Sequence, residues 1–254
     1  MTKVIKADLC IIGAGSGGLS VAAGASQMGA KTVLVEGGKM GGDCLNYGCV
    51  PSKALIAAAK KAHSLHDSEL FGIYGEPPTV DYAKVMEHVS DVIAGIAPHD
   101  SVERFESLGV QVLQGYGTFT RPNQIAVGDT LVEARKFVIA TGSSPVAPPI
   151  PGLEECGYYT NETIFENREK PEHLVIIGGG PIGMEMAQAH NRLGCKVTIL
   201  EAFAALGKDD PELTSIALKA IRGEGVDIRE GVKINSITRQ ADGSVIFDLE
   251  KDGV

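Results

Sequence analysis

Two stretches of the chain share one pattern of apolar, small and polar positions. Residues 9–36 and 174–201 each begin with a short apolar run, pass through glycines into an amphipathic segment, and end in a second apolar run. Gly13 corresponds to Gly178, and the same offset of 165 residues aligns the rest of the two stretches. Short apolar runs bounded by glycine are typical of buried strands, and the amphipathic segment between them is typical of a helix. The sequence therefore predicts two copies of a strand–helix–strand unit.

Each copy carries the pattern G-x-G-x-x-G between its first strand and its helix, and an acidic residue at the end of its second strand. The first glycine permits a tight turn, the second lets a pyrophosphate approach the backbone, and the third lets helix and strand pack closely. The helix N-terminus attracts phosphate, and the acidic residue accepts a hydrogen bond from a ribose hydroxyl. One such motif could be an ordinary strand–helix turn, but two in full context favour two dinucleotide sites. The matching residues are Gly13, Gly15, Gly18 and Glu36 in the first copy and Gly178, Gly180, Gly183 and Glu201 in the second.

Outside the two copies, the pattern predicts further elements and one linker. A proline-rich stretch from Pro145 to Gly152 reads as an extended connection, which places a domain boundary there and gives domains 1–150 and 151–254. Residues 72–78 are rich in turn formers. Helices are predicted over about 45–62, 81–107 and 210–223, and strands over 110–119, 124–128, 131–133, 137–140, 226–230, 232–239 and 244–250.

Composition narrows the class of protein. The 254 residues include 32 glycines, are 44% hydrophobic and carry a formal net charge of −9, which indicates a globular chain and argues against a nucleic-acid partner. No apolar run approaches the roughly 20 residues of a membrane span. The apolar run Leu9–Ile12 is too short for a signal peptide and leads into the glycine motif, so a cytoplasmic location is expected.

Two cysteines, Cys44 and Cys49, lie in the segment 41–53, which reads GGDCLNYGCVPSK. Their spacing is not that of a zinc site. On a regular helix the two side chains would point about 140° apart, so a disulfide requires a break, which Gly48 and Pro51 could supply. Two unlinked buried thiols remain an alternative on spacing alone. The pair His63 and His66 lacks a third ligand nearby, and no metal site is expected.

These motifs, in this order, resemble those of the class I pyridine nucleotide–disulfide oxidoreductases, which include dihydrolipoamide dehydrogenase, glutathione reductase and mercuric reductase. The likeness also covers the strand Gly115-x-Gly117-x-Phe119 and the turn Ala140-Thr141-Gly142. It implies an α/β fold of two Rossmann-like, three-layer ββα domains of the FAD/NAD(P)-binding type. The chain departs from the family at Asp43, where threonine is usual, and at Tyr47, which leaves the subfamily open.

The resemblance also implies residue roles. Cys49 would be the charge-transfer thiol against the flavin, Cys44 the interchange thiol, and Lys53 and Glu185 an ion pair at the flavin ring. NAD(H) would bind through Gly178, Gly180, Ile182, Gly183 and Glu201. FAD would bind through Gly13, Gly15, Gly18, Glu36, Gly42, Lys53, Gly117, Thr141, Gly142 and Ser143.

The expected function is that of an FAD-dependent NADH:disulfide oxidoreductase of the dihydrolipoamide dehydrogenase type. A hydride passes from NADH through FAD to a Cys44–Cys49 disulfide, which reduces a small-molecule or lipoyl-type disulfide. The alternatives are a mercuric-reductase-like metal-ion reductase and a redox-silent FAD/NAD-binding fragment. Family members continue into a dimerisation domain with a His–Glu acid/base pair that this sequence lacks. The full-length protein is thus expected to be a homodimer, and the 254-residue chain inactive on disulfide substrates.

Overall fold

A computed structural model describes residues 3–64, 71–74, 76 and 78–251. The described residues form two compact units. The first comprises the chain up to Pro51 together with Ser90–Pro145, and the second comprises Ser52–Val89 together with the chain from Val146 onward. The limit between ligand-binding domains at residue 150 remains a prediction.

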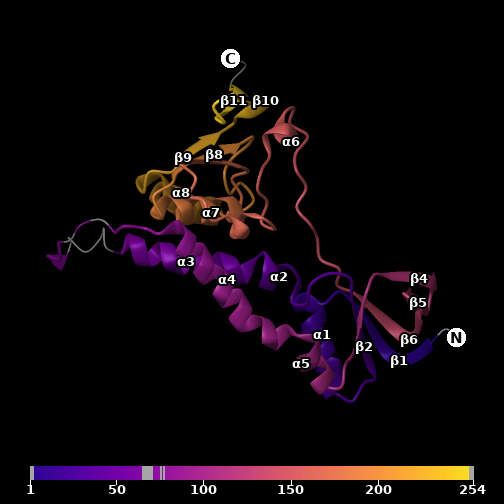
Figure 1. The fold of residues 1–254 in the computed structure, drawn as a ribbon. Coiled ribbons are helices and arrows are strands. Elements are labelled where there is room, and N and C mark those ends of the chain that lie inside the picture. Colours follow the sequence, from indigo (N-terminus) through magenta and orange to yellow (C-terminus); the bar gives the residue numbers. More distant parts are fainter. Residues whose placement is uncertain (1–2, 65–70, 75, 77, 252–254) are drawn as a thin grey trace. The chain divides into compact units, whose positions relative to one another are not determined.

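The first unit is built on a mixed sheet of strand order β3-β2-β1-β6-β5-β4 (Figure 1). Strands β3, β2, β1 and β6 run parallel to one another. Strands β5 and β4 extend the sheet beyond β6 as an antiparallel meander. The strands are β1 (Lys3–Ile12), β2 (Thr32–Glu36), β3 (Gln111–Gln114), β4 (Gly117–Arg121), β5 (Gln124–Val127) and β6 (Thr130–Ile139), and the helices are α1 (Ser16–Gln27), α2 (Gly42–Asn46) and α5 (Val102–Ser107).

Apolar side chains on both faces of the parallel strands form the core of this unit. Ile11 and Leu34 pack with Leu19 of α1 on one face of the sheet. Cys10 and Val33 lie in a second buried cluster with residues of β5 and β6. A strand covered on both faces reads as a continuous apolar run, which is why β1 and β2 were recognisable in the sequence.

Three element limits differ from the sequence prediction. The strands expected at 131–133 and 137–140 are one strand, β6, because its ladder with β1 continues through the charged residues Arg135 and Lys136. The helix expected at 81–107 is interrupted around Pro98, giving α4 (Tyr82–Ile96), a 3₁₀ turn (Ala97–Asp100) and α5. The strand expected at 110–119 divides into β3 and β4 at Gly115, whose φ is +147°.

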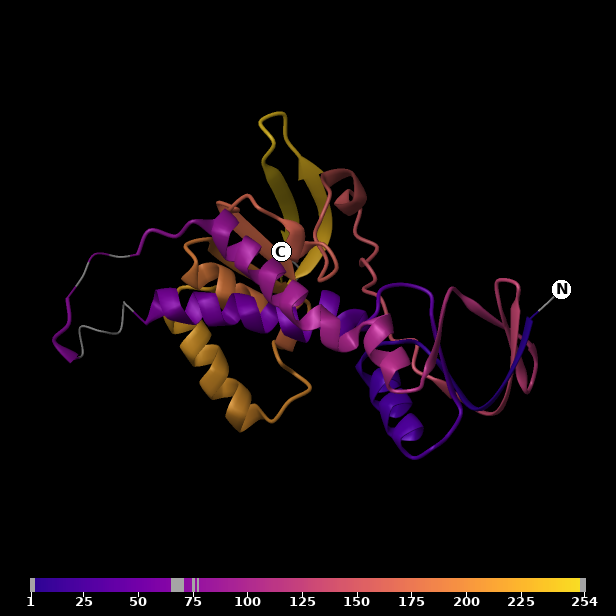
Figure 2. The ribbon, with the colours of Figure 1, turned by 60° about the horizontal axis from the view of Figure 1, so that its bottom comes forward.

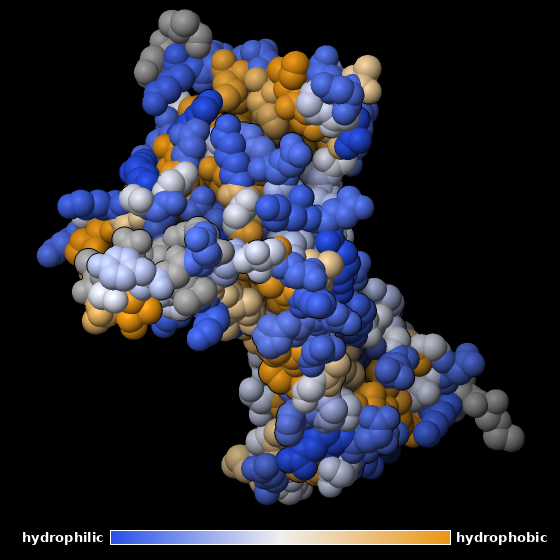
Figure 3. Space-filling view, turned by 60° about the vertical axis from the view of Figure 1, so that its left-hand side comes forward, coloured by the Kyte–Doolittle hydropathy of each residue, from blue (hydrophilic) through white to orange (hydrophobic). Residues whose placement is uncertain are grey.

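The second unit contains a parallel sheet of order β7-β8-β9 and a separate antiparallel hairpin, β10–β11. Figure 2 shows the hairpin in yellow, apart from that sheet. Figure 3 shows hydrophobic side chains gathered near the top of that view. Val245 and Ile246 of the hairpin are exposed. The elements are β7 (His173–Ile177), β8 (Lys196–Glu201), β9 (Asp227–Glu230), β10 (Lys233–Arg239), β11 (Val245–Glu250), α6 (Leu153–Cys156), a 3₁₀ turn (Ile164–Glu166), α7 (Pro181–Arg192), α8 (Pro211–Gly223), α3 (Cys49–His63) from Ser52 onward, and α4 up to Val89.

Residues 140–150 have no regular secondary structure, as the proline-rich composition predicts. Among the described residues, no helix is long and apolar enough to cross a membrane.

A buried hydrogen-bonded pair joins α4 to α7 within the second unit. His190 is fully buried; its Nδ1 lies 2.8 Å from the carbonyl oxygen of Met186, and its Nε2 lies 3.1 Å from the hydroxyl of Tyr82. A neutral ring that donates from Nδ1 and accepts at Nε2 satisfies both contacts. Burial lowers the pKa of His190 and raises the pKa of Tyr82 to about 12. Both side chains are therefore held in their neutral forms.

This pair predicts a loss of stability in acid. Because the pKa of His190 is lower in the folded chain than in the unfolded chain, the unfolded chain binds the proton more tightly. The contribution of His190 to stability is complete above about pH 6.5 and falls below it by at most about 1.4 kcal/mol per pH unit. Denaturant unfolding between pH 8 and pH 5 should show a shallower decline for His190→Gln than for the wild type. Equal slopes in the two proteins would contradict this prediction.

Candidate nucleotide sites and dithiol

The glycines of the first motif are required by close backbone packing. Gly13 has a φ of +104°, and its N–H donates to the carbonyl oxygen of Val35 at 2.8 Å. A side-chain carbon added at Gly18 would overlap the Gly13 carbonyl oxygen, so helix α1 can approach β1 only through glycine. Gly15, by contrast, faces open space, with the Cα of Gly42 as the nearest atom at 3.9 Å from an added carbon. The second glycine of the motif thus leaves room for a ligand.

The second unit repeats this geometry. Gly178 has a φ of +109°, and its N–H donates to the carbonyl oxygen of Leu200 at 2.9 Å. A side-chain carbon at Gly183 would overlap the carbonyl oxygen of Gly178, and one at Gly180 would meet no atom within 4 Å. The predicted duplication is confirmed down to individual backbone hydrogen bonds.

The glutamate that ends each second strand is fixed by two backbone donors. Glu36 accepts from the N–H groups of Ala14 and Gly38, at 2.5 and 2.6 Å. Glu201 accepts from those of Gly179 and Phe203, at 2.7 and 2.8 Å. Each carboxylate is held against its own glycine turn, where a ribose of a bound dinucleotide would lie.

The helices that follow the two motifs leave their first N–H groups without a side-chain cap. Gly15 and Gly180 are the N-cap residues of α1 and α7, neither provides a side-chain hydrogen bond, and neither helix has an acidic residue in its first turn. Such a terminus carries unpaired donors and the positive end of the helix dipole. Together with the open space at each second glycine, this fits the pyrophosphates of FAD and NAD(H).

The two cysteines meet at a break between two helices. Helix α2 ends at Asn46 and α3 begins at Cys49, with Tyr47 at a φ of −141° between them. The break expected around Gly48 is therefore confirmed. Both cysteines are thiols in this structure, and the side chains of Cys44 and Cys49 are hydrogen-bonded to each other. That hydrogen bond and, to a lesser degree, burial raise the pKa of Cys44, so Cys44 retains its proton to a higher pH than an ordinary cysteine.

Helix α2 is packed directly on the first glycine turn. The N–H of Gly41 donates to the carbonyl oxygen of Ala14 at 2.9 Å. Gly42 has a φ of +55°, and an added carbon there would lie 2.6 Å from the Cα of Gly15. Only glycine allows this approach, so the dithiol and the predicted pyrophosphate site belong to one continuous piece of the first unit.

Lys53 and Glu185 form an ion pair in the second unit. The Nζ atom of Lys53 lies 2.8 and 2.7 Å from the two carboxylate oxygens of Glu185. Both side chains are substantially exposed, at 60% and 43%. Lys53 lies on α3, one turn after Cys49. The structure thus brings together the pair that the family resemblance implied, while its role at a flavin remains a prediction.

The other predicted cofactor residues lie at the ends of strands or at a helix start. Thr141–Ser143 follow β6 and are exposed, and Thr141 lies beside Gly13. An added carbon at Gly117 would overlap Ile125, so this glycine serves packing in the first unit. Ile182, in the first turn of α7, is 69% exposed.

The remaining cysteines lie in hydrophobic surroundings. Cys10 and Cys195 are buried, as expected for small core residues, and burial raises the pKa of Cys10 to about 11. Cys156 is also buried, against Leu153 and Ile237. Across the described part of the chain, no three His, Cys, Asp or Glu side chains gather as metal ligands, and His66 lies outside it.

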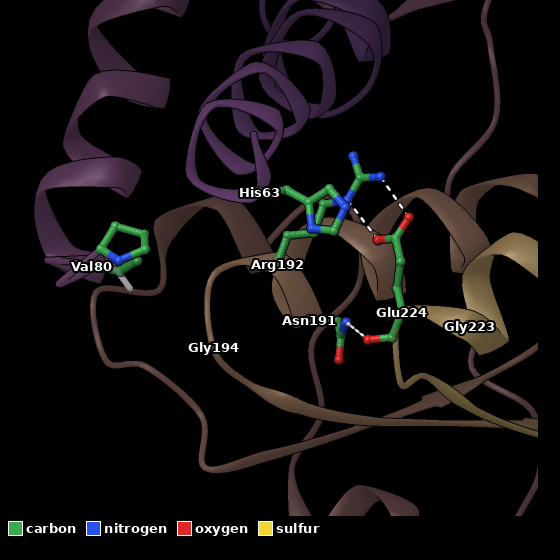
Figure 4. Close-up of a pocket in the computed structure, with 8 residues that line it drawn as sticks. His63, Val80, Asn191, Arg192, Gly194, Gly223 and Glu224 are labelled. Atoms are coloured by element: carbon green, nitrogen blue, oxygen red, sulfur yellow. Dashed lines mark hydrogen bonds and ion pairs between the residues drawn. The ribbon is translucent and has the colours of Figure 1, made fainter. Parts of the chain in front are cut away.

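The second unit contains a cavity of about 460 Å³ that no sequence motif predicted (Figure 4). It lies where the ends of α3, α7 and α8 meet, and Arg192 donates to both carboxylate oxygens of Glu224 at 2.6 Å. Burial acts to raise the pKa of Glu224, but hydrogen bonds from Arg192 and Gln188 outweigh it and lower this pKa. Figure 4 shows the His63 ring beside Arg192. The residues that line this cavity are far apart in the sequence, so no sequence motif could predict it.

Comparisons with known proteins show which family this chain resembles. The family described as pyridine nucleotide-disulphide oxidoreductase matches residues 7–253. A mercuric reductase of Streptomyces lividans is 35% identical over 97% of this chain and 53% of its own length. A dihydrolipoyl dehydrogenase of Thermus scotoductus is 34% identical, also over 97% of this chain and 53% of its own length.

One solved structure is similar in fold and in sequence. It is the Cu(II) complex of the HOCl-induced flavoprotein disulfide reductase RclA from Escherichia coli, with a TM-score of 0.81 and 27% identity. The match covers 96% of this chain and 53% of that one. The chain thus spans about half the length of the relatives that it matches.

Proposed function

Because this chain belongs to the pyridine nucleotide-disulphide oxidoreductase family, we propose that it binds FAD in its first glycine unit and NADH in its second, and uses Cys44 and Cys49 as a redox-active pair. Members of this family are flavoprotein oxidoreductases that use FAD and NAD(P)H. The observation that carries the proposal is the contact between the two thiols across the break that follows helix α2, whose first residue, Gly42, packs on Gly15.

The chemistry divides between the cofactors and the two cysteines. Bound FAD would supply the hydride acceptor for NADH and the two electrons that reduce the disulfide. The Cys44–Cys49 bond breaks on receiving two electrons and one proton, which leaves one thiol and one thiolate. The raised pKa of Cys44 favours the proton on Cys44, and the proposal assigns the thiolate to Cys49. For exchange with substrate, Cys44 must lose that proton to a base, after which its thiolate attacks the substrate disulfide.

The ion pair between Lys53 and Glu185 places a positive charge on the same helix as Cys49. Glu185 fixes the ammonium group of Lys53 with two hydrogen bonds. Lys53 lies four residues after Cys49 on α3, and positions four apart share one face of a helix. We assign Lys53 the role of holding positive charge on the face of α3 that carries Cys49, where a thiolate is stabilised by a nearby cation.

The proposed substrate is a small or lipoyl-type disulfide, and the proposed protein is a cytoplasmic homodimer. A mercuric-reductase-like activity is the second candidate, since the Streptomyces lividans relative is named for it. NADH oxidation by the FAD-loaded full-length protein, assayed separately with lipoamide, glutathione disulfide and Hg²⁺, distinguishes these substrates. Turnover with lipoamide above the other two supports the first candidate, and turnover with Hg²⁺ alone supports the second. Flavin reduction by NADH without electron transfer to the cysteines would contradict both.

The second unit should prefer NADH to NADPH. Glu201 is fixed at the end of β8 by two backbone donors, where a 2′-phosphate would approach its carboxylate. Residues 202–207 contain no Lys or Arg to neutralise that phosphate. Repulsion between like charges should cost NADPH about 1–3 kcal/mol, which corresponds to roughly 5- to 150-fold in affinity. Calorimetric titration of both nucleotides should show this gap, and Glu201→Gln should narrow it. Equal affinities in the wild type would refute the assignment.

A further inference from the structure

Tyr116 is an exposed aromatic residue in the connection between β3 and β4. Its side chain is 84% exposed. The residue before it, Gly115, has a φ of +147° and donates its N–H to the carbonyl oxygen of Glu36 at 2.7 Å. This hydrogen bond fixes the start of the connection against the end of β2. The backbone that carries Tyr116 is thus fixed beside the backbone of Glu36, the last residue of the first repeat.

The ring of Tyr116 lies over Gly37. A side-chain carbon added at Gly37 would lie 2.7 Å from both Cδ1 and Cε1 of Tyr116 and 3.0 Å from Cγ. An atom beside the ring edge would lie much farther from Cγ than from those two carbons, so these distances place the added carbon over the ring face. Gly37 is needed for the ring to occupy this place. The corresponding residue of the second repeat is Ala202, so this requirement for glycine belongs to the first unit.

The order of the strands places Tyr116 next to the expected position of the base. In doubly wound folds, ligands bind at the carboxyl ends of the parallel strands. Here the glycine turn follows β1, Glu36 ends β2, and Tyr116 follows β3, in the sheet order β3-β2-β1. A dinucleotide with its pyrophosphate at Gly15 and its ribose at Glu36 therefore extends its base toward β3. One face of the Tyr116 ring covers Gly37, and the opposite face is exposed to receive that base.

We propose that Tyr116 is a stacking platform for the adenine ring of the dinucleotide held by the first unit, and thereby favours FAD over flavins that lack adenylate. This proposal rests on the proposed function, because it takes the first unit as the FAD site. Stacking of a base on an aromatic side chain contributes affinity without reading hydrogen-bond patterns. The phenol hydroxyl is not needed for it, so phenylalanine preserves the interaction.

The test is calorimetric titration of the wild-type chain and of its variants with FAD and with FMN, which carries the flavin and one phosphate but no adenine. Tyr116→Ala should weaken FAD binding by about 5- to 150-fold, the range measured for loss of one base–aromatic stack. It should leave FMN binding unchanged. Tyr116→Phe should bind FAD as the wild type does. Tyr74→Ala is the matched control, since Tyr74 is 78% exposed in the second unit, and it should alter neither ligand.

The outcomes separate the two proposals. Failure of the wild type to bind either flavin would overturn the FAD site and the stacking role together. Wild-type binding of FAD that Tyr116→Ala leaves unchanged would overturn the stacking role alone. Equal weakening of FAD and FMN by Tyr116→Ala would assign Tyr116 a structural role and also overturn it.

Discussion

Replacing Cys49 with serine should abolish the long-wavelength absorbance that appears when the FAD-loaded protein is reduced by two electrons. That absorbance requires a thiolate against the flavin, and the proposal assigns it to Cys49. Replacing Cys44 with serine should instead give the absorbance before any reductant is added, because Cys49 then has no partner for a disulfide. In the full-length protein, both substitutions should lower the rate of disulfide reduction by at least about a thousandfold, as expected for loss of an essential nucleophile.

Two controls make this prediction specific. Cys156→Ser replaces a buried cysteine of the second unit. In this variant the long-wavelength absorbance should still appear on reduction and disappear on oxidation. The pH dependence of the absorbance in Cys44→Ser reports the titration of Cys49 without its neighbour. Should Cys44→Ser remain without absorbance at high pH while Cys49→Ser shows it, the roles of the two thiols would be reversed.

Replacing Gly18 with alanine should destabilise the first unit and remove its nucleotide binding. The added methyl group would overlap the carbonyl oxygen of Gly13, which is backbone and cannot rotate away. Forced separation of α1 from β1 should cost roughly 1–3 kcal/mol in the free energy of unfolding. It should also shift the glycine turn that leaves room for the pyrophosphate. Urea unfolding and FAD titration of the variant measure the two effects.

The same helix offers a matched control. Gly24 lies in the interior of α1, and an added methyl group there meets no atom within 4 Å. Alanine is the better helix former, so Gly24→Ala should stabilise the chain by about 0.5–1 kcal/mol. The two substitutions are chemically identical, and the structure predicts opposite signs. A loss of stability in both, or in neither, would show that the packing of α1 on β1 is described wrongly.

The features that could be predicted from the sequence lie within short, repeated stretches of the chain. The glycine turns and the glutamates at 36 and 201 each lie within one strand–helix–strand unit, so spacing alone was enough to place them. The helix break at Gly48 was also predictable, because two cysteines five residues apart on a regular helix cannot meet. The pairing of Lys53 with Glu185 came from family resemblance and not from any local pattern.

The features that escaped prediction depend on contacts between distant segments. Strand β6 continues through Arg135 and Lys136 because its backbone pairs with β1, and a charged pair in the sequence hides that pairing. The Tyr116 ring over Gly37 joins β3 to the end of β2, and no spacing rule connects those positions. The cavity beside Arg192 and Glu224 forms where separate helices end. Tertiary packing determines each of these three features, and no local sequence pattern indicates that packing.

The most direct test of the account is to count thiols in the FAD-loaded, oxidised chain before and after one equivalent of NADH is added without oxygen. The chain has five cysteines, so a Cys44–Cys49 disulfide leaves three thiols to be titrated in denaturant. The account predicts that the count rises from three to five when NADH is added, and stays at three when NADH is added without FAD. A count that does not change with NADH and FAD together would contradict the claim that electrons pass from the nucleotide sites to this pair.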